Sequence, residues 1–305
     1  MREIDQPNVI VLMATYNGAL WLKQQIDSIL NQQGVNVQLV VSDDNSTDNT
    51  VDCLNVLTNT HTNIMVLPVV PRLGTAGKNF YRLIKDVDIN SFDYIAFADQ
   101  DDIWNLDKLI NHIKLARQHN AYGVSSNVTA FWPDATKKLI VKSQAQQKYD
   151  FLFESAGPGC TFLMTPWLVN QARVQLNDVK SLARDVAFHD WLVYAICRAH
   201  GHKWVIDAEP SLEYRQHQAN TLGANSGLNA KWARLISLKQ GWYRTEVGKV
   251  CQVACLLSND KNIMQIALLV KNRTLSSMFK LLWYLPELRR SFFDRLAFGL
   301  TIFLF

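Results

Sequence analysis

The sequence has little of several features that would assign a protein class at once. Charged residues make up only 19%, and 31 basic against 27 acidic side chains leave a net charge of +4, too small a bias for a typical nucleic-acid-binding protein. Glycine (13) and proline (8) are too sparse for collagen-like or low-complexity chains, and a hydrophobic content of 48% excludes disorder. We therefore expect a globular protein that binds no nucleic acid.

Cysteine and long apolar segments are also scarce. The five cysteines are scattered without a Cys-x-x-Cys pair, which favours free thiols in a reducing compartment over disulfides or a zinc site. No leader-like apolar run precedes the first predicted strand, and the uncharged apolar run at 296–305 has about half the length of a membrane-spanning helix. These features predict a cytoplasmic protein.

The first 120 residues do contain a regular alternation of strand and helix patterns. Mostly apolar runs, which predict strands, occur at 9–14, 37–42, 64–70 and 94–98, and the first is continuously apolar, as is typical of a strand buried on both faces. Apolar residues at helical spacing follow each run. This order predicts an α/β fold with a mostly parallel sheet and helices on both faces.

The pattern becomes mixed after residue 120. Strand patterns are found at 123–131, 160–164, 204–207 and 212–214, around a helical stretch at 189–200. From about residue 228 the sequence predicts helices alone. We expect these last helices to form a C-terminal extension.

Polar clusters directly follow three of the predicted parallel strands. They are Thr15-Tyr16-Asn17, Asp43-Asp44 and Asp99-Gln100-Asp101-Asp102. Parallel strands end at one edge of a sheet, and ligands bind beyond that edge. The three clusters therefore predict a shared binding site.

The third cluster places three carboxylates within four residues. Such crowding is electrostatically unfavourable unless a cation sits among them, and oxygen ligands select Mg²⁺ or Mn²⁺. The alternative is a solvated acidic loop at a helix start, where aspartate is favourable in any case. The position after a buried strand favours the metal interpretation.

The remaining candidates have two interpretations each. Asp43 and Asp44 could accept hydrogen bonds from a base or ribose, but aspartates are also common in helix-capping turns. Tyr16 could stack on a nucleobase or be a half-buried aromatic. Lys78 and Asn79 open a helix after a glycine-containing loop, which suits a phosphate, although capping by Asn79 alone explains the pattern equally well.

Taken together, these strings resemble the nucleotide-sugar-binding half of family 2 glycosyltransferases, which have the GT-A fold. The resemblance covers about residues 8–222 and continues in Gly159-Cys160-Thr161-Phe162, His189-Asp190-Trp191 and Tyr214-Arg215-Gln216-His217-Gln218-Ala219-Asn220. The strings DQDDIW, HDW and YRQH are most similar to a rhamnosyltransferase-like subgroup. The resemblance implies a GT-A domain over 1–222, with a nucleotide-sugar-binding half (1–120) and an acceptor-binding half (121–222), and an extension over 223–305.

The resemblance also implies roles for the donor-binding residues. Thr15, Tyr16 and Asn17 would lie at the nucleobase, and Asp43 or Asp44 would bond the base edge. Which of the two aspartates does so stays open.

Further along the chain, the resemblance implies the metal and catalytic residues. Asp99 would contact the donor ribose and Asp101 the metal, with Asp102 as a second ligand, directly or through water. Arg215 would contact phosphate, and His217 the metal or the diphosphate. Asp190 would be the catalytic base. Two departures are His189 before that base, where many relatives have an acidic residue, and the four-residue DQDD, which leaves open which aspartate holds the metal.

The implied reaction is an inverting, metal-assisted transfer of a sugar to a hydroxyl. The donor would be dTDP-rhamnose or a UDP-sugar, and the acceptor a growing, lipid-linked surface glycan. A single general base suffices for direct displacement with inversion, without a carboxylate nucleophile. The alternatives are a sugar nucleotidyltransferase, which would need more than the single Gly18 after the first strand, and a non-catalytic nucleotide-sugar-binding protein.

The last 35 residues differ in composition from the rest. They hold six basic and two acidic residues, the whole net charge, together with eight aromatic residues. Basic residues beside aromatics are typical of segments that lie in a membrane interface. We expect peripheral contact with the inner face of the cell membrane through this tail. The alternative is that the aromatics pack on the catalytic domain or form a dimer contact.

Overall fold

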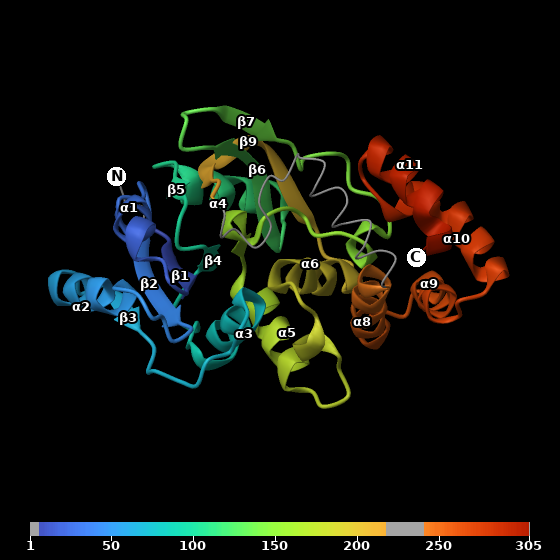
Figure 1. The fold of residues 1–305 in the computed structure, drawn as a ribbon, viewed down its shortest axis with the longest axis horizontal. Helices are drawn as coiled ribbons and strands as arrows, with labels where there is room; N and C mark the ends of the chain where they lie inside the picture. The colour runs from blue at the N-terminus through green and yellow to red at the C-terminus, as the bar shows by residue number, and fades with distance from the viewer. Residues whose placement is uncertain (1–5, 218–240, 305) are drawn as a thin grey trace.

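The computed structural model describes residues 6–217 and 241–304 (Figure 1). The strings at 218–220, the expected domain boundary at 222/223 and the predicted helices between 228 and 240 lie outside the described residues. Figure 1 shows an elongated molecule with the strands of one sheet in its left and central parts and the C-terminal helices at the opposite end from α2.

The N-terminal half of the sheet is parallel, as predicted. β1 (Asn8–Thr15) lies between β2 (Asn36–Asp43) and β4 (Tyr94–Ala98), and β3 (Ile64–Val66) flanks β2. The third strand is shorter than the predicted 64–70. Proline has no N–H to donate to a neighbouring strand, and the backbone carbonyl of Pro68 accepts a bond from the Arg82 guanidinium instead.

The C-terminal half makes the sheet mixed rather than mostly parallel. β8 (Leu163–Met164) is antiparallel to both β4 and β6 (Gly123–Phe131) and thereby joins the two halves. β9 (Trp204–Arg215) runs parallel to β6, and its outer edge carries β5 (Ile103–Trp104). The antiparallel strand β7 (Lys137–Ile140) also pairs with β6.

The two short strands predicted at 204–207 and 212–214 are one strand. The register of β9 against β6 shifts on both sides of Asn127, whose side-chain amide donates to the carbonyl of Ala208 at 2.7 Å. This side-chain bond bridges the irregular stretch, so the chain does not leave the sheet there.

Helices cover both faces of the sheet. On one face lie α1 (Ala19–Leu30), α2 (Thr50–Thr60) and α4 (Lys108–His119), and on the other α3 (Ala76–Asp86), α5 (Pro166–Asn177) and α6 (His189–Ala199). Successive side chains of a strand point to opposite faces, so β1 contributes Val9 and Val11 to one core and Ile10 and Leu12 to the other. Three short 3-10 helices follow in the second half, at Asp150–Leu152 (η1), Gly159–Thr161 (η2) and Ala183–Asp185 (η3).

The predicted C-terminal helices are present in the described residues. They are α8 (Trp242–Leu257), α9 (Lys261–Lys271), α10 (Leu275–Leu288) and α11 (Phe292–Thr301), followed by a 3-10 turn at Ile302–Leu304. Their buried side chains belong to the same hydrophobic core as α3, α5 and α6. None of the described helices is long and apolar enough to cross a membrane.

Candidate active site

The acidic cluster forms a tight turn between β4 and β5. Asp102 has no exposed surface, and burial together with the charges of Asp101 and Asp99 raises its pKa well above the usual range. Burial, reinforced by Asp101 and Asp190, raises the pKa of Asp99 to about 7. One oxygen of Asp102, Oδ2, is buried and has no hydrogen-bond partner among the described residues. The turn therefore crowds carboxyl groups that burial and mutual repulsion drive toward their neutral forms, and a cation among them would favour their ionised forms instead.

His217 and Asp101 meet although 116 residues separate them. The Nε2 atom of His217 lies 2.7 Å from Oδ2 of Asp101, and the imidazole stacks on Trp21 with ring centroids 4.1 Å apart. Trp21, on the first turn of α1, thus orients the imidazole toward the turn. A carboxylate oxygen and an imidazole nitrogen thus lie side by side, and their expected contact with a metal stays a prediction.

Arg215 braces the same turn from β9. Its backbone N–H donates to Oδ1 of Asp102 at 3.2 Å, and its Nε donates to the carbonyl of Asp101 at 2.8 Å. Its Nη2 also donates to the side chain of Gln24 at 2.6 Å. Arg215 therefore bonds directly to the acidic turn, and its expected contact with a phosphate stays a prediction.

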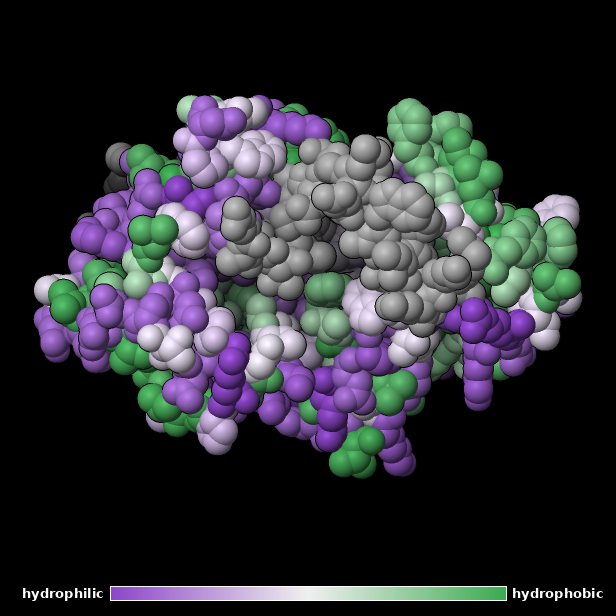
Figure 2. All heavy atoms as spheres, in the orientation of Figure 1, coloured by the Kyte–Doolittle hydropathy of each residue, from purple (hydrophilic) through white to green (hydrophobic). Residues whose placement is uncertain are grey.

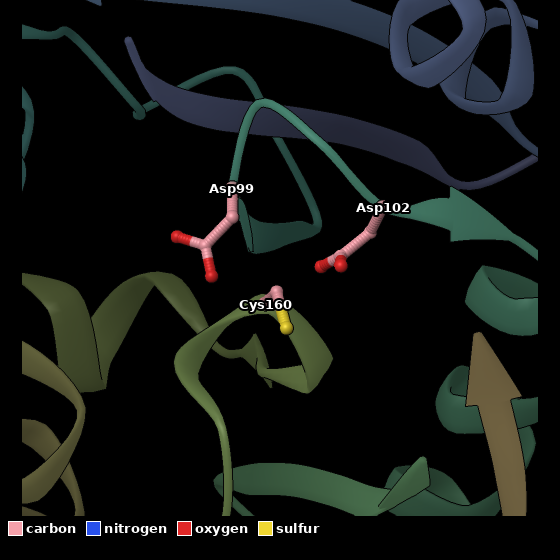
Figure 3. A group of neighbouring side chains, drawn as sticks. All are labelled: Asp99, Asp102 and Cys160. Atoms are coloured by element: carbon pink, nitrogen blue, oxygen red, sulfur yellow. The ribbon is translucent and has the colours of Figure 1, made fainter. Parts of the chain in front are cut away.

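Cys160 lies beneath the turn and was not predicted as a site residue. One ligand atom from each of Asp99, Asp102 and Cys160 fits within a 4.8 Å cluster (Figure 3). Burial raises the pKa of the Cys160 thiol well above its usual range, so the thiol stays protonated. A protonated, soft sulfur is a poor ligand for Mg²⁺ or Mn²⁺.

Lys108 is a second residue that the sequence did not reveal. Only 1% of it is exposed, although it lies on α4. Its Nζ donates to the carbonyl of Cys160 at 2.6 Å and lies 3.0 Å from the centroid of the Trp104 ring. Burial lowers the pKa of Lys108 well below its usual value. The helix is thereby tied to η2, the segment that backs the acidic turn.

Asp190 lies in the first turn of α6, close to η2. Its Oδ1 accepts the backbone N–H of Trp191 at 2.7 Å. Burial raises the pKa of Asp190 to about 6. A Cβ atom at Gly159 would lie only 3.3 Å from Cβ of Asp190, and Cys160 follows Gly159 directly. The candidate base and the acidic turn thus face the same short segment.

His189 is a packed, neutral side chain. Its ring stacks on Phe80 with centroids 3.7 Å apart, and burial lowers the pKa of His189 to about 3. A Cβ atom at Gly159 would lie 2.6 Å from its Nε2, so the imidazole occupies the space that a larger residue at 159 would need. This arrangement favours a role in orienting α6 over proton transfer.

The ends of β1 and β2 are tied together by their polar clusters. The hydroxyl of Thr15 donates to Oδ2 of Asp43 at 2.8 Å, and the backbone N–H of Ser46 donates to Oδ1 of Asp43 at 2.7 Å. The side-chain oxygen of Asn17, which has a left-handed backbone (φ 50°), accepts the N–H of Thr47 at 2.8 Å. These bonds bring the first two predicted clusters together.

The neighbouring aspartates Asp43 and Asp44 differ in burial and in the contacts that they make. Asp44 is 4% exposed and accepts the backbone N–H groups of Leu73 and Gly74, which holds the loop before α3. Asp43 is half-buried at the rim. A carboxylate has about four lone-pair positions, so both retain acceptor capacity for a base.

Tyr16 lies at the meeting point of the first and third clusters. Its backbone N–H donates to Oε1 of Gln100 at 2.8 Å, and Nε2 of Gln100 donates back to its carbonyl at 3.0 Å. The guanidinium of Arg72 lies 4.2 Å from the centroid of the Tyr16 ring. Gln100, which the sequence analysis passed over, fits here because a Cβ atom at Gly18 would lie 2.2 Å from its Oε1.

Lys78 and Asn79 do not join this cluster in the way that the sequence suggested. Asn79 is 1% exposed, and its Nδ2 donates to the carbonyls of Ser42 at 2.7 Å and Thr15 at 3.3 Å. Its amide thus bridges the ends of β1 and β2. The exposed Lys78 lines a separate pocket of about 680 Å³ between α3, η3 and α8. The side-chain donors of Asn79 are thus already used between the two strands, and the expected contacts of Lys78 and Asn79 with phosphate stay predictions.

The fold and the site together define a class of protein. A mixed sheet flanked by helices, with an acidic turn, a histidine and a buried carboxylate beyond the ends of its parallel strands, is the arrangement of nucleotide-sugar-dependent glycosyltransferases with the GT-A fold. Residues 10–161 match the model of glycosyl transferase family 2.

Similarity to known proteins extends this match beyond residue 161. The chain is 44% identical over 239 residues to a dTDP-rhamnosyl transferase, RfbG, of Shigella flexneri, with 78% of this chain and 83% of the relative covered. It is 31% identical over 170 residues, 55% of this chain and 64% of the relative, to the UDP-Glc:alpha-D-GlcNAc-diphosphoundecaprenol beta-1,3-glucosyltransferase WfgD of Escherichia coli. The chain therefore belongs to glycosyl transferase family 2 and is a glycosyltransferase, not a sugar nucleotidyltransferase or a non-catalytic binding protein.

A solved structure supports the fold independently. The mannosyltransferase PcManGT of Pyrobaculum calidifontis, solved with GDP-Man and Mn²⁺, superimposes with a TM-score of 0.54 at 17% identity, covering 98% of this chain and 76% of that one. At this identity the similarity concerns the fold alone. The predicted GT-A fold with a helical C-terminal region is confirmed.

Proposed function

We propose that the protein transfers rhamnose from dTDP-rhamnose to a hydroxyl of a growing surface glycan, with inversion at the anomeric carbon. The observation that supports this most directly is the 44% identity to a dTDP-rhamnosyl transferase over most of both chains. Such a reaction also fits the site: the acidic turn and Asp190 both lie close to η2, and His217 contacts the turn through Asp101.

Asp190 is the proposed general base. The acceptor oxygen attacks the anomeric carbon, the bond from that carbon to the diphosphate oxygen breaks, and the nucleoside diphosphate leaves. The acceptor proton passes to the Asp190 carboxylate. Because burial raises the pKa of Asp190 to about 6, the carboxylate is a stronger base than an ordinary aspartate and is still ionised near neutral pH.

Asp101 and His217 are the proposed ligands of Mg²⁺ or Mn²⁺, with Asp102 behind them. The adjacent oxygen and nitrogen atoms 2.7 Å apart, and the buried, unpartnered Oδ2 of Asp102, suit a cation. A bound cation would stabilise the negative charge that develops on the diphosphate. The alternative set, Asp99, Asp102 and Cys160, includes the buried thiol and suits a hard cation less well.

The donor nucleoside is proposed to lie over the ends of β1 and β2. Thr15, Tyr16, Asn17, Asp43 and Asp44 are polar or aromatic and come together there through mutual bonds. Asp99 is proposed to bond the donor ribose. Arg215 and Lys78 remain candidates for phosphate contact, Arg215 from its place beside the turn and Lys78 from its place in the first turn of α3.

The acceptor is proposed to be a lipid-linked glycan, and the enzyme to work in the cytoplasm at the inner face of the membrane, which it contacts peripherally. The name of the relative WfgD describes a diphosphoundecaprenol-linked acceptor. A substrate held in a membrane requires an enzyme that reaches the membrane surface. The C-terminal helices are the part of the chain that we propose for this contact.

A panel of nucleotide sugars tests the proposal. The purified full chain is incubated with Mn²⁺ and with dTDP-rhamnose, UDP-glucose, UDP-GlcNAc or GDP-mannose, and both the melting temperature and nucleoside diphosphate release are measured. A donor at 100 times its Kd stabilises the folded state by about 2.7 kcal/mol. We expect stabilisation and release with dTDP-rhamnose and loss of both with a chelator. A response to UDP-glucose alone would reassign the donor, and no response to any donor would contradict the proposed function.

A further inference from the structure

The C-terminal helices expose an unusual number of large apolar side chains. Trp283 is 87% and Phe293 is 78% exposed. We define the apolar face as the exposed large side chains of α10, α11 and the turn after them: Leu275, Phe279, Trp283, Phe292, Phe293, Leu296, Leu300 and Phe303. Figure 2 shows hydrophobic colouring gathered over α10 and α11 at one end of the molecule.

These residues form one surface. On α10 they recur every four positions, at 275, 279 and 283, and on α11 at 292, 296 and 300, a spacing that places each set on one side of its helix. The rings of Phe279 and Phe303 touch, with centroids 5.4 Å apart, and this contact joins the two helices' sets.

The opposite sides of the same helices are also apolar. Met278, Leu281 and Leu288 of α10, with Phe298 of α11, are buried in the protein core. Water-exposed helices of globular proteins usually have a polar outer side, whereas helices apolar all round are surrounded by protein or lipid. The outer side of α10 and α11 therefore lacks the composition of a surface in permanent contact with water.

Half of the basic residues of this tail are used inside the protein. Arg289 donates to the carbonyl of Phe153 at 2.8 Å, Arg290 is 5% exposed and pairs with Asp150, and Arg295 donates to the carbonyl of Arg289 at 2.7 Å. The exposed basic residues are Lys271, Arg273 and Lys280, which precede or flank the apolar side chains of α10.

We propose that the apolar face inserts into the interfacial region of a lipid bilayer, with Lys271, Arg273 and Lys280 against lipid phosphates. The proposal rests on the proposed lipid-linked acceptor. Tryptophan and phenylalanine beside lysine and arginine are the side chains that interfacial helices use. A symmetric contact with a second copy through the apolar face would place six basic side chains, three from each copy, in or beside one interface, where like charges are unfavourable.

The bonds that Arg289, Arg290 and Arg295 make within the protein change how the attachment works. With three exposed basic residues rather than six, attraction to anionic lipid contributes less than the sequence suggested, and the aromatic side chains contribute more. Salt screens charge attraction but not apolar burial. The attachment should therefore persist at high salt and on neutral lipid.

Vesicle flotation with full-length protein tests this. The wild type is compared with the triple variant Trp283→Ser, Phe292→Ser, Phe293→Ser. The matched control is Leu20→Ser, Val69→Ser, Val179→Ser, which removes three side chains of similar exposure, 79%, 77% and 84%. Vesicles are made of phosphatidylcholine alone or with about 30% phosphatidylglycerol. Since three large apolar groups are removed, we expect the bound fraction of the triple variant to fall at least about tenfold. The wild type and the control should float with both kinds of vesicle. They should also do so at 0.5 M salt, where the screening length is about 4 Å.

A second readout separates this proposal from the proposed function. With a water-soluble acceptor the triple variant should turn over like the wild type, and with an acceptor in vesicles it should be slower by about the loss of bound fraction. Flotation without transferase activity would contradict the proposed function and leave the docking proposal standing. Equal flotation of wild type and triple variant, or flotation by neither, would overturn the docking proposal. A wild-type dimer that the triple variant converts to monomers would identify a second copy as the occupant.

Discussion

Replacing Asp190 by asparagine should abolish turnover and stabilise the protein at the same time. The substitution keeps the size of the side chain, and an asparagine Oδ1 can still accept the backbone N–H of Trp191, which lies 2.7 Å from Oδ1 of Asp190. It removes the negative charge. If the Asp190 carboxylate is the base of the reaction, removing its charge stops turnover. Because burial makes this charge unfavourable, removing it also raises the free energy of unfolding, so the two effects must occur together.

The magnitude follows from the pKa of Asp190. Burial raises it from 3.8 to about 6, and each unit corresponds to about 1.4 kcal/mol, so keeping the charge costs up to about 3 kcal/mol. Asp190 is partly exposed, and solvent screening reduces this to about 1–2 kcal/mol. The folded state binds the proton of Asp190 more tightly than the unfolded state does. Below about pH 4 the carboxyl is protonated and this cost is absent. As pH rises from 4 to 6 the carboxyl ionises, and the free energy of unfolding of the wild type falls by the same amount.

The assay measures urea unfolding and turnover of wild type and Asp190→Asn from pH 4 to 8. We expect equal stability at pH 4, a variant that is about 1–2 kcal/mol more stable above pH 6, and a loss of turnover of at least about a hundredfold. Wild-type kcat/KM should rise through about pH 6, and the residual activity of the variant should not. Asp185→Asn, an exposed aspartate five residues upstream, is the control and should change neither. Retained turnover would refute the base assignment, and a stability difference independent of pH would refute the electrostatic reasoning.

Three further substitutions test the acidic turn and the residues around it. Asp101→Asn should abolish the Mn²⁺-dependent rise in melting temperature with dTDP while leaving unfolding without metal within about 1 kcal/mol; an unchanged metal response would contradict its role as a ligand. Gly159→Ala should lower kcat at least tenfold with a smaller effect on donor affinity, because the added methyl group would lie 2.6 Å from Nε2 of His189 and must displace α6; normal kcat in stopped-flow turnover would show that the site relaxes around it. Gly18→Ala should weaken donor binding in titration calorimetry, because the methyl group would lie 2.2 Å from Oε1 of Gln100 and break the bonds of Gln100 to the backbone of Tyr16; unchanged affinity would show that donor binding does not depend on these bonds.

The parallel strands were predictable because each is a short, mostly apolar run bounded by polar residues. β1, β2 and β4 begin and end within about two residues of the predicted positions. The helix α5 was not predicted, although Pro166 at its first position after Thr165 is a recognised start signal. The strands β5 and β7 have only two and four residues, and nothing in such short segments distinguishes them from loops. Their existence depends on tertiary pairing.

Asp190 was indicated by the family resemblance alone, because an aspartate is common at a helix start. The clustered carboxylates of Asp99–Asp102 were predictable from their residue type, which is unusual in such number directly after a buried strand. Lys108 was not, because a lysine near the start of an amphipathic helix normally faces water, and only the fold shows it beneath the turn. Asn79 is a case in which the sequence pattern allowed more than one interpretation. An amide at a helix start suggests a phosphate contact, whereas its donors are used between β1 and β2.

The C-terminal tail shows why net charge alone is weak evidence for a binding surface. The sequence places six basic residues among eight aromatics, and both groups divide in the same way: Arg290 and Phe298 are buried, while Lys280 and Trp283 are exposed. The buried members hold the extension against the catalytic half. The guanidinium of Arg290 donates to the carbonyl of Ser155, and the hydroxyl of Ser155 is among the groups that influence the pKa of Asp190. The same helices that expose the apolar face are therefore bonded, through Arg290 between α10 and α11, to the segment beside the proposed base Asp190. If the membrane proposal holds, the part of the chain that attaches the enzyme is also the part that supports this segment.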